Sequence, residues 1–150
     1  MTDVIDEALK IAPGSRLDLL RAARPEVRRR TQSSYDALFD PPEEESLALG
    51  ERFVVALRVA ESSGSPGLAA HYRARLESLP VGAGEASWVA ILRHVDRVTR
   101  EPRALSAADL HALAAAGLDE ATIVTLSQIV SFVAYQVRVA AALALLGEDA

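Results

Sequence analysis

The chain has 150 residues, half of them apolar, which is enough for one domain with a single sizeable core. Its net charge of -5 argues against a general nucleic-acid-binding protein, because such proteins present a basic surface. The absence of cysteine excludes disulfides, thiolate metal ligands, cysteine nucleophiles and dithiol redox chemistry carried by this chain alone.

The distribution of apolar residues predicts an all-α fold. No segment alternates apolar and polar residues over the length of a strand, and the prolines and glycines fall between helical patterns. We expect one domain over residues 1–150 with about seven helices, made of an N-terminal helical arm (1–42) and a core (43–150). The first residues are too charged for a secretory signal, so we expect a cytoplasmic protein.

Three helices are predicted in the arm. The first covers residues 3–12, the second follows the capping residue Ser15, and the third begins with Pro25 and ends at Asp40, which precedes two prolines. The second and third helices are rich in arginine: Arg21, Arg24, Arg28, Arg29 and Arg30. A basic patch for a phosphate or an acidic partner is one interpretation, but the overall charge favours a solvated helix face paired with nearby carboxylates.

The helix predicted over residues 47–61 follows an acidic run at residues 43–45 and the capping residue Ser46. It is apolar on two sides, which places it at the centre of the domain. Its polar line contains Glu51 and Arg58, which could form a structural pair or a pair that orients a substrate.

A break at residues 62–66 separates this helix from the next, with Ser65 as the cap and Pro66 as the first residue. Tyr72 lies on the apolar face of the new helix, and His71 lies about 100° away at the edge of that face. The glycine-containing loop at residues 81–84 follows a helix, so it lacks the strand that precedes a phosphate-binding loop.

Three more helices complete the chain. The first, residues 85–99, has an apolar stripe that leaves His94 outside. The second opens with a capping box of Ser106 and Asp109 and closes at Gly117.

Asp119 caps the last helix, residues 120–146, whose second half is as apolar as a membrane span. Gln128, Gln136 and Arg138 interrupt it, so we expect no membrane crossing. Instead we expect a helix buried on nearly all sides, in the core or against another subunit, which predicts a homo-oligomer.

The residues that could carry chemistry are few. His71, His94 and His111 are not spaced as a helical metal pair, so we predict no metal and no cofactor, and we expect structural roles for them. His71 and Glu51 remain the weak catalytic candidates. Arg58 and Arg138 are the candidates for binding a ligand, although Arg138 is first expected to determine the fold or an interface.

Residues 51–72, ERFVVALRVAESSGSPGLAAHY, resemble the core of the alkylhydroperoxidase D-like proteins of the carboxymuconolactone decarboxylase superfamily. In that family an apolar helix leads to a glycine and then to a CxxCxxxH segment. Residues 104–147 resemble the C-terminal half of the peroxidase-related members. From residue 51 to residue 147 the two segments span about two thirds of the chain.

The resemblance implies an active site whose residues are absent here. Matching the two helices places the family's glutamate at Phe53, its two cysteines at Ser65 and Leu68, and its histidine at Tyr72. A shift of one residue would instead use Arg52, Gly64, Gly67 and His71. Family members with the dithiol reduce a peroxide, and a serine hydroxyl has neither the low pKa nor the disulfide state of a thiol. We therefore expect no thiol peroxidase activity from this chain alone.

We interpret the chain as a degenerate member of this superfamily: an oligomeric, non-peroxidatic scaffold that binds a partner or a small ligand, with a cysteine-bearing paralogue as a candidate partner. In this interpretation Phe53, Leu68 and Tyr72 fill the pocket beneath residues 64–72. The alternative is a cofactor-free decarboxylase- or isomerase-type enzyme acting on a small organic acid or lactone. It requires His71, Glu51 and either Arg58 or Arg138 to converge on one pocket.

Overall fold

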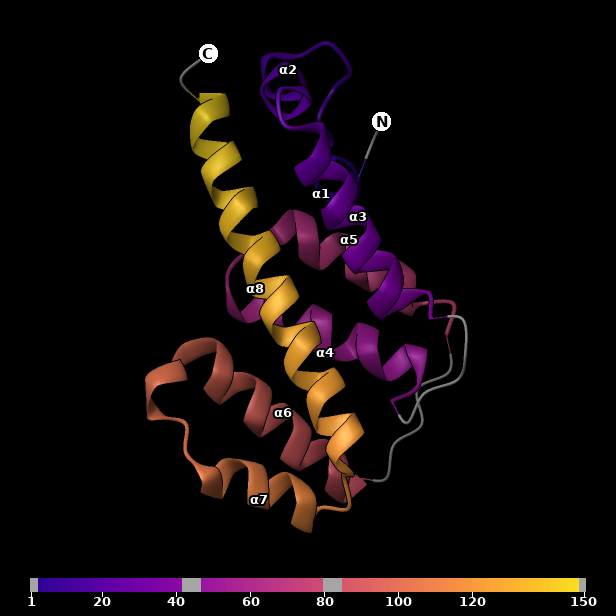
Figure 1. The fold of residues 1–150 in the computed structure, drawn as a ribbon, viewed down its shortest axis with the longest axis vertical. Helices are drawn as coiled ribbons and strands as arrows, with labels where there is room; N and C mark the ends of the chain where they lie inside the picture. The colour runs from indigo at the N-terminus through magenta and orange to yellow at the C-terminus, as the bar shows by residue number, and fades with distance from the viewer. Residues whose placement is uncertain (1–2, 42–46, 80–84, 149–150) are drawn as a thin grey trace.

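The computed structural model describes residues 3–41, 47–79 and 85–148, and this part of the chain is almost entirely helical (Figure 1). Its elements are α1 (Val4–Leu9), α2 (Arg16–Ala22), α3 (Pro25–Phe39), α4 (Leu49–Ser62), α5 (Pro66–Leu76), α6 (Glu85–Arg100), the 3₁₀ helix η1 (Pro102–Ala104), α7 (Ala107–Ala115) and α8 (Glu120–Glu148). The predicted all-α fold is confirmed. The acidic run at residues 43–45, its cap Ser46 and the loop at residues 81–84 lie outside the described residues.

Most helix boundaries follow the capping residues. Ser15 Oγ accepts from the Asp18 N–H at 3.2 Å, and Asp119 Oδ1 accepts from the Thr122 N–H at 2.8 Å, so both predicted caps are confirmed. The first helix ends earlier than residue 12, because Lys10 adopts a left-handed conformation (φ 53°) and its N–H bonds back to the carbonyls of Asp6 and Glu7.

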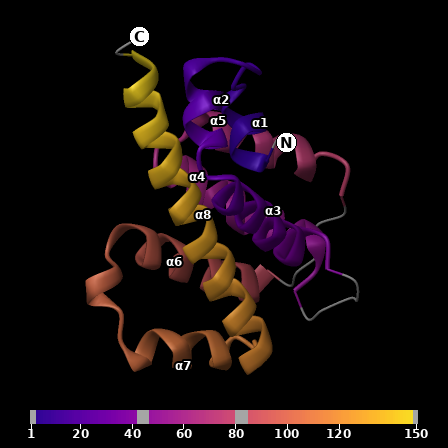
Figure 2. The ribbon, with the colours of Figure 1, turned by 45° about the horizontal axis from the view of Figure 1, so that its top comes forward.

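Helix α4 occupies the centre of the molecule, as predicted. It packs against α3, α5, α6 and α8, and both of its apolar stripes are buried (Figures 1 and 2). Phe53, Val55, Ala56 and Val59 each keep 4% or less of their surface exposed. The adjacent α5 then runs back along α4 after the turn at Gly64, whose positive φ of 66° suits glycine.

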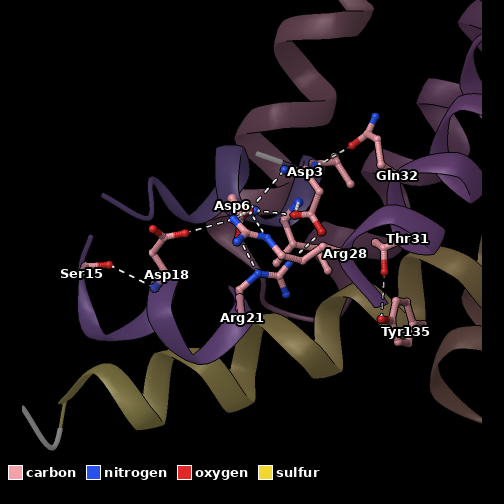
Figure 3. Close-up of polar contacts among 11 residues, drawn as sticks. Asp3, Asp6, Ser15, Asp18, Arg21, Arg28, Thr31, Gln32 and Tyr135 are labelled. Carbon is pink, nitrogen blue, oxygen red and sulfur yellow. Dashed lines mark hydrogen bonds and ion pairs between the residues drawn. The ribbon is translucent and has the colours of Figure 1, made fainter. Parts of the chain in front are cut away.

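A network of buried charges, which the sequence did not predict, joins the three helices of the arm to one another (Figure 3). Asp6 of α1 accepts from Arg21 and Arg28, Asp3 accepts from Arg21, and Asp18 accepts from Arg28 at 3.1 Å. The expected solvated arginine face is therefore wrong for Arg21 and Arg28, because the start of α1 lies between α2 and α3. The prediction of a solvated arginine face is confirmed for Arg29 and Arg30, whose exposed side chains both pair with Glu26.

Helix α8 runs the length of the molecule, with the arm beside its C-terminal part and α6 and α7 beside its start (Figure 1). Over Glu120–Gly147 it is long and apolar enough to cross a membrane, with a mean hydropathy of 1.9, a property that core helices of soluble proteins share. Only 33% of the most apolar 18-residue stretch of α8 is buried. Val124 and Leu145 on this helix are 56% and 66% exposed. Burial on nearly all sides is thus wrong for the single chain, because its own helices cover only one side of α8.

Candidate functional site

The turn between α4 and α5 brings together the positions that the resemblance matched to a redox site. Phe53 lies on α4, Ser65 precedes α5, and Leu68 and Tyr72 lie on α5, one turn apart. Leu68 and Tyr72 have no exposed surface, and Phe53 is 4% exposed. The prediction that these three side chains fill the space beneath the turn is confirmed.

Two further aromatic rings complete the filling, and both come from α3. The Phe39 ring centroid lies 4.9 Å from that of Phe53 and 5.4 Å from that of Tyr72, and the Tyr35 ring stacks at 6.4 Å from Tyr72. Such offset and tilted pairs add to the stabilisation from apolar burial. The N-terminal arm therefore supplies two of the four rings of this aromatic core.

Tyr72 is held by one polar contact in this apolar setting. Its hydroxyl donates to the side-chain carbonyl of Gln136 on α8, a residue with no exposed surface. The Gln136 Nε2 has no hydrogen-bond partner in the described part of the chain. Burial raises the pKa of Tyr72 well above its ordinary value, so its phenol stays protonated and serves as a donor rather than a base.

Ser65 stands at the N-cap of α5 with Pro66 as the first helical residue, as predicted, but its side chain makes no capping hydrogen bond. Its backbone carries the contacts instead: its N–H donates to the carbonyl of Ala60, and its carbonyl accepts from the Ala69 N–H. No base contacts its hydroxyl among the described residues, so nothing there would activate it as a nucleophile.

In the alternative register the glutamate position falls on Arg52. Its buried guanidinium donates to the carbonyls of Leu47 at 2.8 Å and Leu38 at 2.9 Å, which closes the chain around the start of α4. These contacts give Arg52 a structural role in the described part of the chain.

His71 lies beside the aromatic core rather than in it. Its Nε2 is 2.9 Å from the hydroxyl of Tyr35, and its ring meets the Tyr72 ring edge-on at 5.3 Å. Burial lowers the pKa of His71, so the imidazole is neutral at pH 7. Burial also raises the pKa of Tyr35 to about 12, which keeps this phenol protonated.

A hollow of about 510 Å³ opens beside His71, between the end of α1 and the outer side of α5. Its charged lining residues are Glu7, Lys10 and Arg75. On the α3 side of α5, Arg75 also borders a second hollow of about 400 Å³, together with Asp36 and Asp40.

The other predicted site residues are placed elsewhere. The Glu51 carboxylate accepts from the Ala48 N–H at 2.9 Å and so caps α4. Arg58 makes a bidentate pair of 2.8 Å bonds with Asp96 of α6. The suggested Glu51–Arg58 pair does not form, because each side chain has a nearer partner.

Arg138 and the remaining histidines also lie apart from His71. Arg138 is exposed on α8, and His111 is exposed on α7. His94, expected outside the apolar stripe of α6, is 7% exposed and faces α7, with an Nδ1 that has no partner in the described part of the chain. Burial lowers its pKa.

The sequence missed three contributors to this region: Lys10, Tyr35 and Arg75. Tyr35 and Arg75 lie on helices and Lys10 follows one, and the local pattern gives no reason to single out any of them. One usable signal was the spacing of His71 and Arg75, four residues apart and therefore on the same side of α5. No local signal pairs Tyr35 with His71, because 36 residues separate them.

No family model and no curated protein matches the chain. Among solved structures it is similar to an uncharacterized peroxidase-related protein from Silicibacter sp. TM1040. The superposition covers 85% of this chain and 74% of that protein, with a TM-score of 0.61 and 20% sequence identity. At this identity the likeness concerns the fold: the chain has the fold of a peroxidase-related protein.

Proposed function

We infer that this chain is a non-peroxidatic protein on a peroxidase-related fold, a degenerate relative of the alkylhydroperoxidase D-like proteins that works by self-association and binding. The observation that carries this is the packed state of the matched positions. Phe53, Leu68 and Tyr72 are each 4% exposed or less and belong to one apolar core, so a peroxide has no access to Leu68, one of the two positions matched to the thiols.

Surface composition supports the self-association. Large apolar side chains stay exposed on α2, α3 and α8: Leu19, Leu20, Val27, Val124, Tyr135, Leu145 and Leu146. Apolar surface of this extent commonly marks a protein interface. A second copy of the chain is the first candidate to cover it, and a cysteine-bearing paralogue on the same fold is the second.

The alternative enzyme has weaker support. It needs His71, Glu51 and either Arg58 or Arg138 in one pocket, whereas Glu51 caps α4 and Arg58 is engaged by Asp96.

The test combines an activity assay with an assembly measurement. The purified chain is incubated with hydrogen peroxide or cumene hydroperoxide and excess dithiothreitol, and peroxide loss is compared with a protein-free blank. We expect no saturable turnover, and light scattering after size exclusion should give a mass above one chain. Saturable peroxide reduction would contradict the first half of the proposal, and a strictly monomeric protein would contradict the second.

A further inference from the structure

The hollow between α1 and α5 is built by an unusually close approach of these helices. A Cβ at Gly67 would lie 2.7 Å from the backbone carbonyl oxygen of Ala8, so only glycine allows this spacing. The resulting volume of about 510 Å³ is within the range of small-molecule sites. It lies outside the packed aromatic core, so this inference goes beyond the proposed function and does not depend on it.

The charges that line the hollow are not used by the fold. Lys10, Arg75 and Glu7 form no ion pair with any other described residue, and the net charge of the three is positive. The neighbouring Arg73 is different, since it pairs with Glu61 at 2.6 Å. An arginine fork without a carboxylate partner fits a ligand carboxylate through two parallel hydrogen bonds.

The uncharged part of the lining indicates that a ligand of this hollow would have an apolar body as well as a carboxylate. One wall is made of small apolar residues: Ala8, Pro66, Ala70 and Ala74. The imidazole of His71 adds neutral polar atoms beside this wall. Glu7 would repel a second negative charge, which disfavours phosphate and dicarboxylates.

We propose that this hollow binds a small monocarboxylic acid with an apolar body, whose carboxylate pairs with Arg75 and Lys10 while its body lies against the alanine-rich wall of α5. His71 then contacts the ligand from the side of the aromatic core. The site takes one cation from the end of α1 (Lys10) and the other from α5 (Arg75), so it exists only in the folded chain.

The probe is benzoate, with benzamide as its uncharged analogue, titrated into the full chain and followed by the amide NMR shifts of residues 66–75. We expect saturable shifts with a Kd on the order of 1 mM for benzoate and at least about tenfold weaker binding of benzamide. Arg75→Gln should weaken benzoate binding about tenfold, because one charge-assisted contact is lost. Arg73→Gln is the matched control on the same helix and should leave the Kd within about twofold.

Lys10→Gly separates binding from folding. Glycine adopts the left-handed backbone of this position without strain, so the midpoint of urea unfolding should stay or rise while benzoate binding weakens about threefold or more. Equal binding of benzamide and benzoate, equal losses from Arg73→Gln and Arg75→Gln, or no saturation up to about 10 mM would overturn the assignment.

Discussion

At the scale of single residues, the packing at the centre of the molecule depends on the hydrogen bond that one buried tyrosine makes. Tyr72 is fully buried and its hydroxyl has one partner, Gln136, which is itself fully buried. If either side chain of such a pair is removed, the polar group of the other stays buried without a hydrogen-bond partner. The position that the resemblance matches to a histidine therefore links α5 and α8.

Tyr72→Phe should lower the free energy of unfolding by about 1–3 kcal/mol, because it leaves the Gln136 side chain without its described partner. Tyr135→Phe is the matched control: its partly exposed hydroxyl contacts Thr31 at 3.1 Å, and its loss should cost less, about 0.5–1 kcal/mol. Urea unfolding measures both. Adding Gln136→Leu to Tyr72→Phe should recover part of the lost unfolding free energy, because it also removes the unpaired amide. If the losses from the two substitutions simply add, Tyr72 and Gln136 are not coupled.

Two histidines, the half-buried His71 and the buried His94, make stability depend on pH. Burial lowers the folded-state pKa of His71 and of His94 from 6.5, so the unfolded chain takes up protons first as the pH falls. Their contribution to stability is present above pH 6.5 and is lost as the pH drops through the folded values. Asp96 and Asp109 also have lowered pKa values, and their contribution is lost only below their ordinary value of 3.8.

We therefore expect the free energy of unfolding, measured with urea between about pH 7.5 and 5, to decrease with acidification below pH 6.5. His71→Gln or His94→Gln should flatten this decrease relative to the parent chain. A flat profile in the parent, or an unchanged slope in both variants, would show that burial does not control these imidazoles.

At the scale of elements, the three helices of the arm are held to one another by charge as well as by apolar packing. Val4 and Ile5 are buried, and the carboxylates of Asp3 and Asp6 lie in the same buried region between α2 and α3. Two guanidiniums neutralise them there (Figure 3). The arm thus holds Tyr35 and Phe39 against the α4–α5 pair, which is how it shapes the candidate site.

Arg28→Met should cost about 3–5 kcal/mol of unfolding free energy, since it removes a cation from a carboxylate, Asp6, that is 2% exposed. Arg29→Met deletes an arginine on the same helix whose pair with Glu26 is exposed, and it should cost no more than about 1 kcal/mol. Urea unfolding compares the two variants. Similar losses for both would mean that the Arg28 network adds nothing beyond a surface ion pair.

At the scale of the whole molecule, four exposed leucines lie on α2 and on the C-terminal part of α8, two helices that pack against each other (Figure 1). Leu19 and Leu145 are 64% and 66% exposed, and Leu20 and Leu146 accompany them. We call these four residues the leucine patch. Such a patch favours covering by another apolar surface.

The double variant Leu19→Arg/Leu145→Arg should shift the chain to a smaller assembly in light scattering after size exclusion, because it places charge in the leucine patch. Leu110→Arg on α7 is the matched control, since Leu110 is 47% exposed and lies at the other end of the molecule. Vesicle flotation of the parent chain tests the competing possibility that a membrane covers the patch. Flotation with no change in mass for the double variant would favour the membrane.

Much of the fold could be predicted from local sequence. Pro25 begins a helix, Ser15 and Asp119 cap helices, and Gly117 ends one, because each acts on backbone groups within a few residues of itself. The two apolar stripes of α4 likewise determined that this helix is central. The packed state of Phe53, Leu68 and Tyr72 followed from their apolar character and helical spacing.

What the tertiary structure alone decided is which distant residues meet. Tyr35 reaches His71, Gln136 reaches Tyr72, and Asp6 reaches Arg28, across separations that helical periodicity does not encode. The same holds for Glu51 and Arg58, which share a helix yet take different partners. Sequence by itself determined the helices, their caps and the absence of thiol chemistry carried by this chain, since these depend on local hydrogen bonding and residue type. The hollow of Lys10 and Arg75 arises only when α1 approaches α5, because packing between helices sets that distance.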